Sequence, residues 1–581
     1  MTNKEVAEIL DETGTLLELK GENSFKCRAY HNVARIVGAL TSDINTLAKE
    51  KQLTSIAGIG KGLAETINEL VASGRSTEHE KLRSSVPQGL LEMLRIPGLG
   101  PKRVRIIFEK LNISTLEELK LAAEQHRMAA MDGFGKKTEE NLLMGIEQLH
   151  RYADKFHYPI ARKSADRLLA TLSKEKGVIR CEVAGSLRRR KEVVGDIDIL
   201  VSAGKANVHR IMKVFTTHAE VESVVAQGPT KSSVVLTSGI RCDLRVVDDS
   251  EYPFALAYFT GSKEHNVGMR TRAKTFGWSM NEYGFSRIGD GSKRGTSKRL
   301  VKCASEEDVY RALELAFIPP ELREDMGELD ASVRSGLPRL IEAKDIRGTF
   351  HCHTTYSDGS NTVEEMARAA RDRGWSYLGI ADHSKVATYA GGLTEARVKA
   401  QHKEIESLNS LDSSFRIFKG TEVDILADGS LDWSEKVLAS FDFVVASIHS
   451  KFKMTEAEAT KRLIKALKNR HVTMLGHPTG RLLLQREGYP VNMKDVINAA
   501  ADYGKVIEIN SHPNRLDLDW RHCKYAKEQE VLISINPDAH LTTGLDDVSY
   551  GVGIARKGWL EASNVLNTMT LEKVSKYLYS H

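Results

Sequence analysis

The stretch Val194-Gly-Asp-Ile-Asp-Ile-Leu-Val201 alternates polar and apolar side chains through its centre. Successive side chains of a β-strand point to opposite faces, so Asp196 and Asp198 share one face of a strand here. The isoleucine after each of them points to the other face, toward a core. The stretch therefore predicts a half-buried strand that presents two carboxylates on one side.

A second stretch, Ile240-Arg-Cys-Asp-Leu-Arg-Val-Val247, repeats the alternation and places Asp243 between Arg241 and Arg245 on one face. Three carboxylates on neighbouring strands suit a pair of Mg²⁺ ions, which activate an attacking hydroxyl and stabilise a leaving phosphate. We predict that Asp196, Asp198 and Asp243 are the catalytic Mg²⁺ ligands. Asp243 is expected to orient or deprotonate the hydroxyl, and Arg241 to bind substrate.

A third stretch, Gly185-Ser-Leu-Arg-Arg-Arg190, follows another predicted strand. Its backbone N–H groups, together with Ser186 and Arg189, suit the oxygens of a triphosphate. An Asp-x-Asp pair alone is commonly just a solvated strand edge. The Gly185-Ser186 pair and the third aspartate make a nucleotidyltransferase site the favoured interpretation.

The first part of the chain repeats a short glycine signal. It occurs as Ile56-Ala-Gly-Ile-Gly-Lys-Gly62, Ile96-Pro-Gly-Leu-Gly-Pro-Lys102 and Met131-Asp-Gly-Phe-Gly-Lys-Lys137. Each copy resembles the helix-hairpin-helix motif, in which a tight glycine turn brings backbone N–H groups at a helix N-terminus to a DNA phosphate. One copy would be an ordinary turn, whereas three copies followed by basic residues favour DNA binding. The predicted DNA-binding residues are Gly58, Gly60, Lys61, Gly98, Gly100, Lys102, Gly133, Gly135 and Lys136.

Further motifs narrow the nucleotidyltransferase resemblance. Gly185-Ser186 with Gly195-Asp-Ile-Asp198 resembles the superfamily, and Tyr258-Phe-Thr-Gly-Ser262 with Met280-Asn-Glu-Tyr-Gly-Phe285 resembles the family X DNA polymerases, the polymerase β-like group. The resemblance covers residues 1 to about 318. It implies gapped or primer–template DNA and dNTPs as substrates.

The same resemblance implies roles for residues near the incoming nucleotide. Tyr258 would lie beside the sugar and disfavour ribonucleotides, with Phe259 and Gly261 lining the same pocket. Asn266 would reach the minor-groove edge of the incoming base. The closed thumb and the template strand would be sensed by Arg270, Glu282 and Tyr283. Gly185, Ser186, Arg189 and Gly195 complete the substrate-binding set.

Two positions depart from the family pattern. The family's Schiff-base lysine falls on Thr66, and a hydroxyl cannot form a Schiff base, so deoxyribose-phosphate lyase activity would need Lys61 or Lys26. After Asn266 the chain has Val267 and Gly268. The long polar side chain that stacks on the template base in relatives is missing, which predicts a looser template contact.

A different pattern begins near residue 347. Short apolar runs recur, and nearly every one ends in His, Asp or Glu, with amphipathic helical stretches between them. The runs are Gly348-Thr-Phe-His-Cys-His353, Tyr377-Leu-Gly-Ile-Ala-Asp-His383, Phe418-Lys-Gly-Thr-Glu422, Phe443-Val-Val-Ala-Ser-Ile-His449, Val472-Thr-Met-Leu-Gly-His477, Val506-Ile-Glu-Ile-Asn510 and Val531-Leu-Ile-Ser-Ile-Asn-Pro-Asp-Ala-His540. Buried parallel strands have this appearance, and polar groups at their carboxyl ends are typical of a barrel active site. The pattern predicts a seven-stranded barrel.

The polar residues that end these runs, or follow them closely, form a mixed imidazole and carboxylate set: His351, His353, Asp358, His383, Glu422, His449, His477, Asp538 and His540. Such a set suits Mn²⁺, Zn²⁺ or Fe²⁺. Any single histidine among them would more often be structural. The complete set predicts a metal site.

The motifs His-x-His, Tyr-Ser-Asp-Gly, Asp-His-Ser, Gly-Thr-Glu, His-Ser, Gly-His-Pro and Asp-Ala-His resemble those of the PHP (polymerase and histidinol phosphatase) domain over residues 347–581. The resemblance implies up to three ions, Mn²⁺ or Zn²⁺. The first would be held by His351, His353, Glu422 and Asp538, the second by Glu422, His449 and His477, and the third by Asp358, His383 and His540. Asp382 would support the ligands. Arg481 would contact phosphate or lie on a solvated surface.

Composition limits the remaining possibilities. The 581 residues are 41% hydrophobic and 28% charged, with a net charge of +5, and predict three or four globular domains. No apolar run is long enough to span a membrane and no signal peptide is evident, so we expect a cytoplasmic protein without a membrane partner. We also expect a monomer. The six scattered cysteines contain no Cys-x-x-Cys pair, so neither a zinc ribbon nor a disulfide framework is indicated.

The predicted fold class is multi-domain α+β and α/β. It combines a helical helix-hairpin-helix region, a nucleotidyltransferase palm with a thumb, and a distorted seven-stranded (β/α) barrel. The expected boundaries are 1–85 for the N-terminal domain, 86–150 for fingers, 151–254 for palm, 255–318 for thumb, 319–346 for a linker and 347–581 for the PHP domain.

The main hypothesis is a DNA repair polymerase that fills short gaps and has a Mn²⁺-dependent 3′–5′ exonuclease in its PHP domain. The modest charge favours short synthesis over replication. One alternative keeps the polymerase and makes the PHP domain a metal-stabilised, non-catalytic scaffold. Another is a small-substrate phosphatase fused to a DNA-binding module, which the three aspartates argue against.

Overall fold

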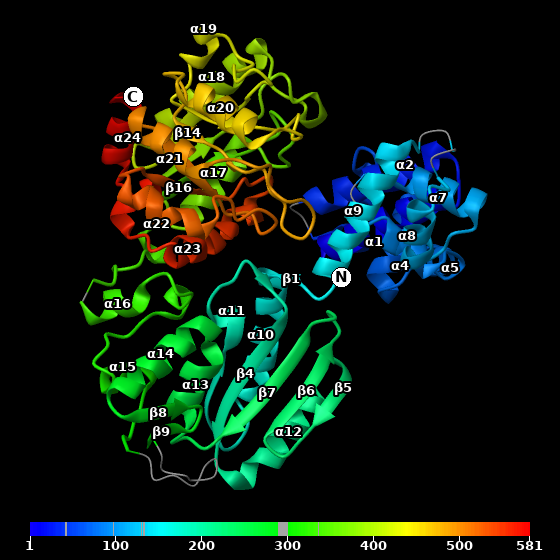
Figure 1. The fold of residues 1–581 in the computed structure, drawn as a ribbon. Coiled ribbons are helices and arrows are strands. Elements are labelled where there is room, and N and C mark those ends of the chain that lie inside the picture. Colours follow the sequence, from blue (N-terminus) through cyan, green and yellow to red (C-terminus); the bar gives the residue numbers. More distant parts are fainter. Residues whose placement is uncertain are drawn as a thin grey trace. The chain divides into compact units, whose positions relative to one another are not determined.

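The computed structural model describes residues 1–40, 43–96, 98–128, 131, 134–288, 300–334 and 336–580. The chain forms two compact units, Met1–Ala153 and Asp154–His581. Figure 1 colours them along the sequence, with the first unit in blue to cyan. The two units are treated separately below.

The first unit is helical. Its helices are α1 (Asn3–Leu19), α2 (Ser24–Ala39), α3 (Ile44–Lys49), α4 (Lys61–Ser73), α5 (Thr77–Ser85), α6 (Gln88–Met93), α7 (Pro101–Leu111), α8 (Leu116–Glu124) and α9 (Lys136–Tyr152). One core gathers the apolar faces of α1, α2 and α4, and a second gathers those of α6 to α9. The predicted helical N-terminal region is confirmed.

The second unit begins with a five-stranded sheet in the order β2-β4-β7-β6-β5 (Figure 1). Its strands are β2 (Val178–Val183), β4 (Asp196–Ala203), β5 (Val221–Gln227), β6 (Lys231–Leu236) and β7 (Arg241–Val247), of which only β4 and β7 pair in parallel. Helices α10 (Tyr158–Leu172) and α12 (Val208–Thr216) pack their apolar faces onto it. The expected strand from Val194 is divided, since β3 (Val193–Val194) ends before Gly195 and pairs with β1 (Phe156–His157).

Helices α13 (Tyr252–Thr260), α14 (Lys263–Thr275) and α15 (Glu306–Ala312) follow, together with the hairpin of β8 (Trp278–Asn281) and β9 (Gly284–Arg287). The segment expected as a linker contains the short helices η3 (Pro320–Leu322) and α16 (Glu328–Val333). Arg323 of this segment is fully buried, and its Nη1 lies 2.6 Å from Oε1 of Glu306 in α15. This segment is therefore packed against the preceding helices over much of its length.

The last part of the chain is a barrel of seven parallel strands in sequence order. They are β10 (Gly348–Cys352), β11 (Tyr377–Ile380), β12 (Arg416–Asp424), β13 (Phe443–Ser447), β14 (Met474–Leu475), β15 (Val506–Asn510) and β16 (Ile533–Asn536). Cys352 after β10 bridges Ala539 after β16, which brings the first and last strands together. The predicted seven-stranded barrel is confirmed.

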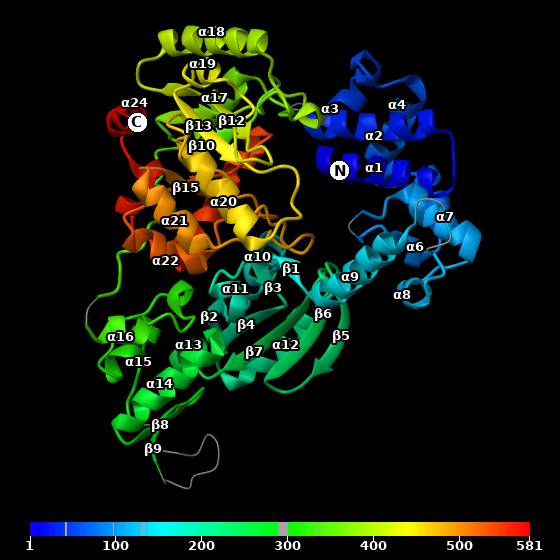
Figure 2. The same ribbon diagram turned by 45° about the horizontal axis from the view of Figure 1, so that its top comes forward.

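Helices surround the barrel strands, as Figure 2 shows. They are α17 (Val363–Asp372), α18 (Glu395–Leu411), α19 (Glu435–Leu438), α20 (Glu456–Leu467), α21 (Met493–Asp502), α22 (Trp520–Glu528), α23 (Val548–Lys557) and α24 (Leu571–Ser580). Nearly every strand residue is buried because these helices cover the outside, which explains the continuous apolar runs. Within the described residues, no helix combines the length and apolarity needed to cross a lipid bilayer.

Candidate active sites

The three predicted catalytic aspartates lie on the paired strands β4 and β7. Asp198 is directly opposite Asp243, and Asp196 is opposite Arg241. Both strands alternate as predicted, with Ile197, Ile199, Cys242 and Leu244 buried on the other face. The sheet register thus brings the carboxylates from two distant stretches of sequence to one face of the sheet.

The electrostatics around the three aspartates favour a bound cation. Burial, and then the neighbouring carboxylates of Asp196 and Asp243, raise the pKa of Asp198 to about 6. Asp243 is partly compensated, since Lys231 Nζ lies 2.5 Å from Oδ2 and Ser233 Oγ donates to Oδ1 at 2.6 Å. Both partners come from β6, and sequence reasoning missed them although Lys231-Ser-Ser-Val-Val-Leu alternates like its neighbours.

The three aspartates fit divalent ions by charge, but they are not drawn together here. Among the described residues, the side-chain groups that converge closely enough to hold an ion all lie in the barrel. Asp243 is turned to Lys231 and Ser233 instead. A cation that binds between the aspartates would replace Lys231 as the counter-charge of Asp243.

The predicted triphosphate turn is helix α11 (Gly185–Arg188), which directly follows β2. Gly185 has φ of +62°, and a Cβ atom on it would lie 2.4 Å from Oδ2 of Asp198. Only glycine fits this backbone and this close approach to the carboxylate. The Gly-Ser turn and the Asp-x-Asp strand are therefore parts of one site.

Arg189 follows this turn but faces another group of residues. Its guanidinium donates to Oε1 of Glu324 at 3.0 Å and to the carbonyl oxygen of Thr260 at 2.5 Å. The role of Arg189 at the triphosphate stays a prediction, and in this structure two of its donors are already used.

The structure brings together several residues predicted to contact the nucleotide. Asn266 Nδ2 donates to the carbonyl oxygen of Tyr258 at 2.7 Å. The guanidinium of Arg245 lies 4.4 Å from the centre of the Phe259 ring, and Gly261 lies beside Arg189. These residues come from β7, from α13 and α14 and from the turn between these two helices. Arg245 of β7 thus connects Phe259 of α13 to the strand that carries Asp243.

The remaining predicted residues of this half lie farther along the chain. Arg270 is half-buried on α14, and Glu282 and Tyr283 form the turn between β8 and β9, where Asn281 Oδ1 accepts the Tyr283 N–H at 2.9 Å. A Cβ atom on Gly268 would lie 2.3 Å from Leu329 of α16. A long side chain at this position would therefore collide with α16.

The glycine turns of the first unit each begin a helix. Gly60, Gly100 and Gly135 are the N-cap residues of α4, α7 and α9, and no side chain caps these helices. The first N–H groups of α4 and α9 are thus left for an outside acceptor such as a phosphate. In α7 the first such group belongs to Lys102, because Pro101 has no N–H. Gly133, predicted to bind DNA, lies outside the described residues.

The position expected to hold a Schiff-base lysine is occupied by a hydroxyl. Thr66 Oγ1 donates to the carbonyl oxygen of Gly62 at 3.3 Å. Nearby, Lys26 Nζ forms an ion pair with Glu78 at 2.8 Å, and its pKa is raised by that hydrogen bond. Lys26 is therefore charged at neutral pH, which disfavours it as a nucleophile.

The nine predicted barrel ligands converge at the carboxyl ends of the strands. Three groups are close enough to hold ions: His353, Asp358, His383 and His540; His351, His353 and Asp538; and His383, Glu422 and His449. Glu422 lies at their centre, since its carboxylate is within 3.2 Å of nitrogens of His351, His383, His449 and His477. All nine residues thus belong to one cluster.

Three features of the cluster fit metal ions. Nε2 of His351 and Nδ1 of His353 and of His383 are buried without a well-aligned hydrogen bond among the described residues. Burial would raise the pKa of Glu422, but the surrounding imidazoles hold it well below its usual range. Burial and the neighbouring imidazoles of His540 and His383 lower the pKa of His353 to about 3, which keeps it neutral, as a ligand must be.

A second layer of buried groups orients these ligands. Oε1 of Glu508 lies 2.6 Å from His351 Nδ1, and its Oε2 accepts the His477 N–H at 2.6 Å. Asp424 lies 3.2 Å from His449 Nδ1. Sequence reasoning missed both, although Glu508 lies within the predicted run 506–510 and Asp424 lies two residues beyond the run that ends at Glu422. Such partners fix the ring orientation of metal-bound histidines.

Asp382 supports the loop that carries Asp358. Its carboxylate accepts hydrogen bonds from the Thr354 N–H, the Thr354 hydroxyl, Ser357 and Gln401. Arg481 neither lies on a solvated surface nor contacts the cluster. Its guanidinium donates hydrogen bonds to Asp519 and to the carbonyl oxygens of Arg515 and Leu516. Asp382 thus holds Thr354 and Ser357 in place, and its support of the metal ligands stays a prediction.

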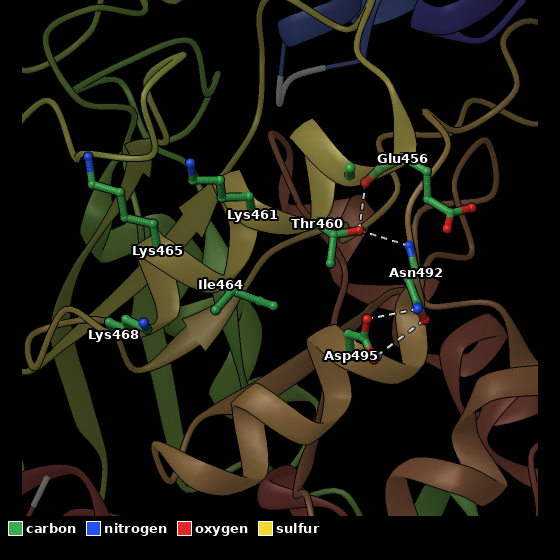
Figure 3. Close-up of a pocket in the computed structure, with 9 residues that line it drawn as sticks. Glu456, Thr460, Lys461, Ile464, Lys465, Lys468, Asn492 and Asp495 are labelled. Carbon is green, nitrogen blue, oxygen red and sulfur yellow. Dashed lines mark hydrogen bonds between the residues drawn. The ribbon is translucent and has the colours of Figure 1, made fainter.

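A separate hollow of about 570 Å³ lies between α20 and α21 (Figure 3). Thr460 donates to the carbonyl oxygen of Glu456 and accepts the Asn492 N–H, and Asn492 also bonds Asp495. Lys461, Lys465 and Lys468 extend from α20 along its edge. Its central polar groups are paired with one another, so the catalytic chemistry is assigned to the two clusters above.

Models of four domain families match this chain. A helix-hairpin-helix domain matches residues 1–76, and a SAM-like helix-hairpin-helix tandem matches residues 90–148. The DNA polymerase beta thumb matches residues 255–324, and the PHP domain matches residues 349–512.

Individual relatives match either the whole chain or a part of it. DNA polymerase/3′-5′ exonuclease PolX of Bacillus subtilis (strain 168) is 38% identical over 580 residues, which is 100% of this chain and 99% of that protein. A probable phosphatase of Thermoanaerobacter sp. (strain X514) is 30% identical over 240 residues, 39% of this chain and 92% of its own length. DNA polymerase lambda of Rattus norvegicus is 25% identical over 343 residues, 55% of this chain and 56% of its own length. Because the first alignment covers both halves, the chain belongs to the PolX-type family X DNA polymerases with a C-terminal PHP domain.

Proposed function

We infer that this protein is a DNA polymerase for short gap filling in DNA repair that also has a 3′–5′ exonuclease in its PHP domain. The observation that carries this function is the presence of two separate clusters of potential metal ligands in one chain of this family. One is an aspartate trio beside a Gly-Ser turn, and the other is a histidine-rich cluster inside a barrel.

For the polymerase, Asp196, Asp198 and Asp243 are the residues that would hold Mg²⁺. Bound at these carboxylates, Mg²⁺ would lower the pKa of the primer 3′-hydroxyl and stabilise the leaving pyrophosphate. Asp243 orients the hydroxyl and takes up its proton. The N–H groups of the Gly185-Ser186 turn bind triphosphate oxygens, and Tyr258 borders the sugar.

For the exonuclease, the nine barrel residues would hold up to three ions, Mn²⁺ or Zn²⁺. Such ions supply a nucleophilic water at neutral pH and neutralise charge on the phosphodiester. Glu508 keeps His351 in the orientation and tautomer needed for binding, and Asp424 does the same for His449. The barrel walls exclude bulk water from the ligands, most of which are buried.

The domain boundaries given above, DNA binding by the glycine turns and action as a monomer belong to this proposal. The uncapped helix N-termini at Gly60, Gly100 and Gly135 support phosphate binding without base recognition. The packed segment that follows α15 supports a fixed attachment of the PHP domain to the thumb.

The test is gap filling on DNA with a one-nucleotide gap, with 3′ degradation of the same primer assayed in parallel. The wild-type protein should incorporate a dNTP with Mg²⁺ or Mn²⁺, and the variant with Asp196, Asp198 and Asp243 all changed to Asn should not. His351→Ala should abolish 3′ degradation and spare incorporation. The absence of incorporation by wild-type protein would refute the polymerase, and trimming that survives His351→Ala would refute the assigned nuclease site.

A second candidate function keeps the polymerase and makes the PHP domain a metal-stabilised scaffold. In this scaffold function the buried ligand set binds metal ions but does not hydrolyse DNA. Metal content and 3′ degradation of the purified protein separate the two, because a scaffold would contain ions and leave 3′ ends intact.

A further inference from the structure

Arg515 lies at the barrel cluster with part of its hydrogen-bonding capacity unused. The loop after β15 places its Nε 3.5 Å from Oδ2 of Asp538, and the side chain is 18% exposed. Its Nη1 is buried and has no hydrogen-bond partner among the described residues. A buried guanidinium donor is costly to leave unpaired, and a phosphate oxygen is a strong partner for it.

Tyr389 lies at the rim of the same cluster. It belongs to η5 (Thr388–Ala390), its side chain is 72% exposed, and its ring centre lies 6.2 Å from that of His383. Tyr389 and Arg515 therefore border the same cluster, Tyr389 beside His383 and Arg515 beside Asp538.

The loop that carries Tyr389 is held in place rather than free. Val386 N–H donates to Oδ2 of Asp432 at 3.1 Å, and Leu393 N–H donates to the His383 carbonyl oxygen at 2.8 Å. A Cβ atom on Gly392 would lie 2.0 Å from the carbonyl oxygen of Ser384, so the two ends of the loop are in close contact. An exposed aromatic ring on a fixed loop beside a cluster of metal ligands is a suitable surface for a planar ligand.

We propose that Arg515 and Tyr389 form the subsite for the 3′-terminal nucleotide of the DNA strand that is degraded. Arg515 binds a phosphate oxygen, and Tyr389 stacks on the terminal base. The subsite rests on the proposed exonuclease. In that reaction water adds to the terminal phosphorus, the bond to the 3′ oxygen of the preceding nucleotide breaks, and that oxygen takes a proton, so that a dNMP and a new 3′-hydroxyl are released.

Stacking of this kind requires an accessible base face. A terminal base that is paired and stacked in a duplex must leave its neighbours first, whereas an unpaired or single-stranded end is ready to bind. Aromatic stacking accepts every base, because each has a π-face. The subsite therefore selects frayed and mispaired 3′ ends without base specificity.

The test uses the full-length protein with Mn²⁺ and two single-stranded oligonucleotides, one with a normal 3′ nucleotide and one with an abasic 3′ residue. Tyr389→Ala should raise KM on the normal substrate about tenfold and leave the abasic substrate unchanged, while Tyr389→Phe should match wild type. Arg515→Gln should lower kcat/KM on both substrates at least tenfold. Gap filling serves as the folding control for every variant.

The outcomes separate this subsite from the proposed function. Wild-type protein that leaves both oligonucleotides intact would refute the exonuclease itself. Active wild-type protein with equal losses on both substrates in Tyr389→Ala would overturn stacking. Metal content is measured for Arg515→Gln, because loss of ions would show that Arg515 only supports Asp538 and would overturn its contact with phosphate.

Discussion

Nζ of Lys557 in α23 lies 2.5 Å from Oε1 of Glu324, and the Lys557 side chain is completely buried. Its ammonium also donates to the carbonyl oxygen of Arg189 at 3.1 Å, and Glu324 in turn binds Arg189 Nε at 3.0 Å. A helix of the barrel thus contacts the residue that follows the Gly-Ser turn of the polymerase site. A second contact between a barrel helix and the polymerase part is made by Trp520 of α22, whose Nε1 donates to Oε1 of Glu192 at 3.2 Å.

This contact predicts that a substitution in the barrel affects the polymerase. Lys557→Met leaves Glu324 with less compensation and frees Arg189 to move, and removal of one partner of a buried pair costs roughly 3–5 kcal/mol. We expect a lower Tm and a KM for dNTP raised about tenfold in gap filling. The exonuclease rate should stay near wild type.

The matched control is Lys573→Met, which changes an exposed lysine of α24. It should alter neither KM nor Tm. An unchanged KM in folded Lys557→Met would show that the contact only joins the two halves and does not position the nucleotide site.

Asp198→Asn should abolish incorporation and at the same time stabilise the metal-free protein. The folded-state pKa of Asp198 is raised to about 6, so between pH 4 and 6 the folded state binds more protons and loses stability as pH rises. At pH 7 the charged form costs about 3 kcal/mol, of which Asn removes most. Calorimetry in EDTA should show a higher Tm at pH 7, and an advantage that shrinks toward pH 4.

Added Mg²⁺ provides the contrast for this variant. It should raise the Tm of wild-type protein more than that of Asp198→Asn, because only wild type has all three carboxylates. If Asp198→Asn is less stable than wild type in EDTA, the three carboxylates do not repel one another as described.

Gly185→Ala should reduce incorporation strongly with little effect on the exonuclease. The added Cβ would come within 2.4 Å of Oδ2 of Asp198, and alanine is strained at φ of +62°. The turn or the carboxylate must shift, and we expect kcat to fall at least a hundredfold in single-nucleotide gap filling. Gly374→Ala is the control, because it has φ of +76° with no neighbour within 4 Å and lies far from the aspartates in the sequence. It should keep wild-type incorporation.

Glu508→Gln should weaken metal binding in the barrel. The change keeps the shape but removes the carboxylate that fixes His351 Nδ1 and the His477 backbone. Loss of such a partner typically lowers metal affinity 10–100-fold. Metal content after dialysis and 3′ degradation should both fall, while gap filling is retained. Full metal content in the variant would contradict the orienting role of Glu508.

The sequence by itself determined the chemistry of both clusters and much of the architecture. The period-two alternation around Asp196, Asp198 and Asp243 gave their common face, and the repeated runs that end in His, Asp or Glu predicted a seven-stranded barrel. These features follow from local patterns, since strand periodicity and ligand type can be read from neighbouring residues.

Tertiary structure decided which distant residues meet. The partners Lys231, Glu508 and Arg515 were missed, and Arg481, expected at phosphate or on a solvated surface, bonds Asp519 instead. The segment expected as a linker instead packs around the buried Arg323. A salt bridge or a second layer of ligands depends on strand register and on how loops fold back, and these arise from packing between elements far apart in the chain. No local pattern specifies them.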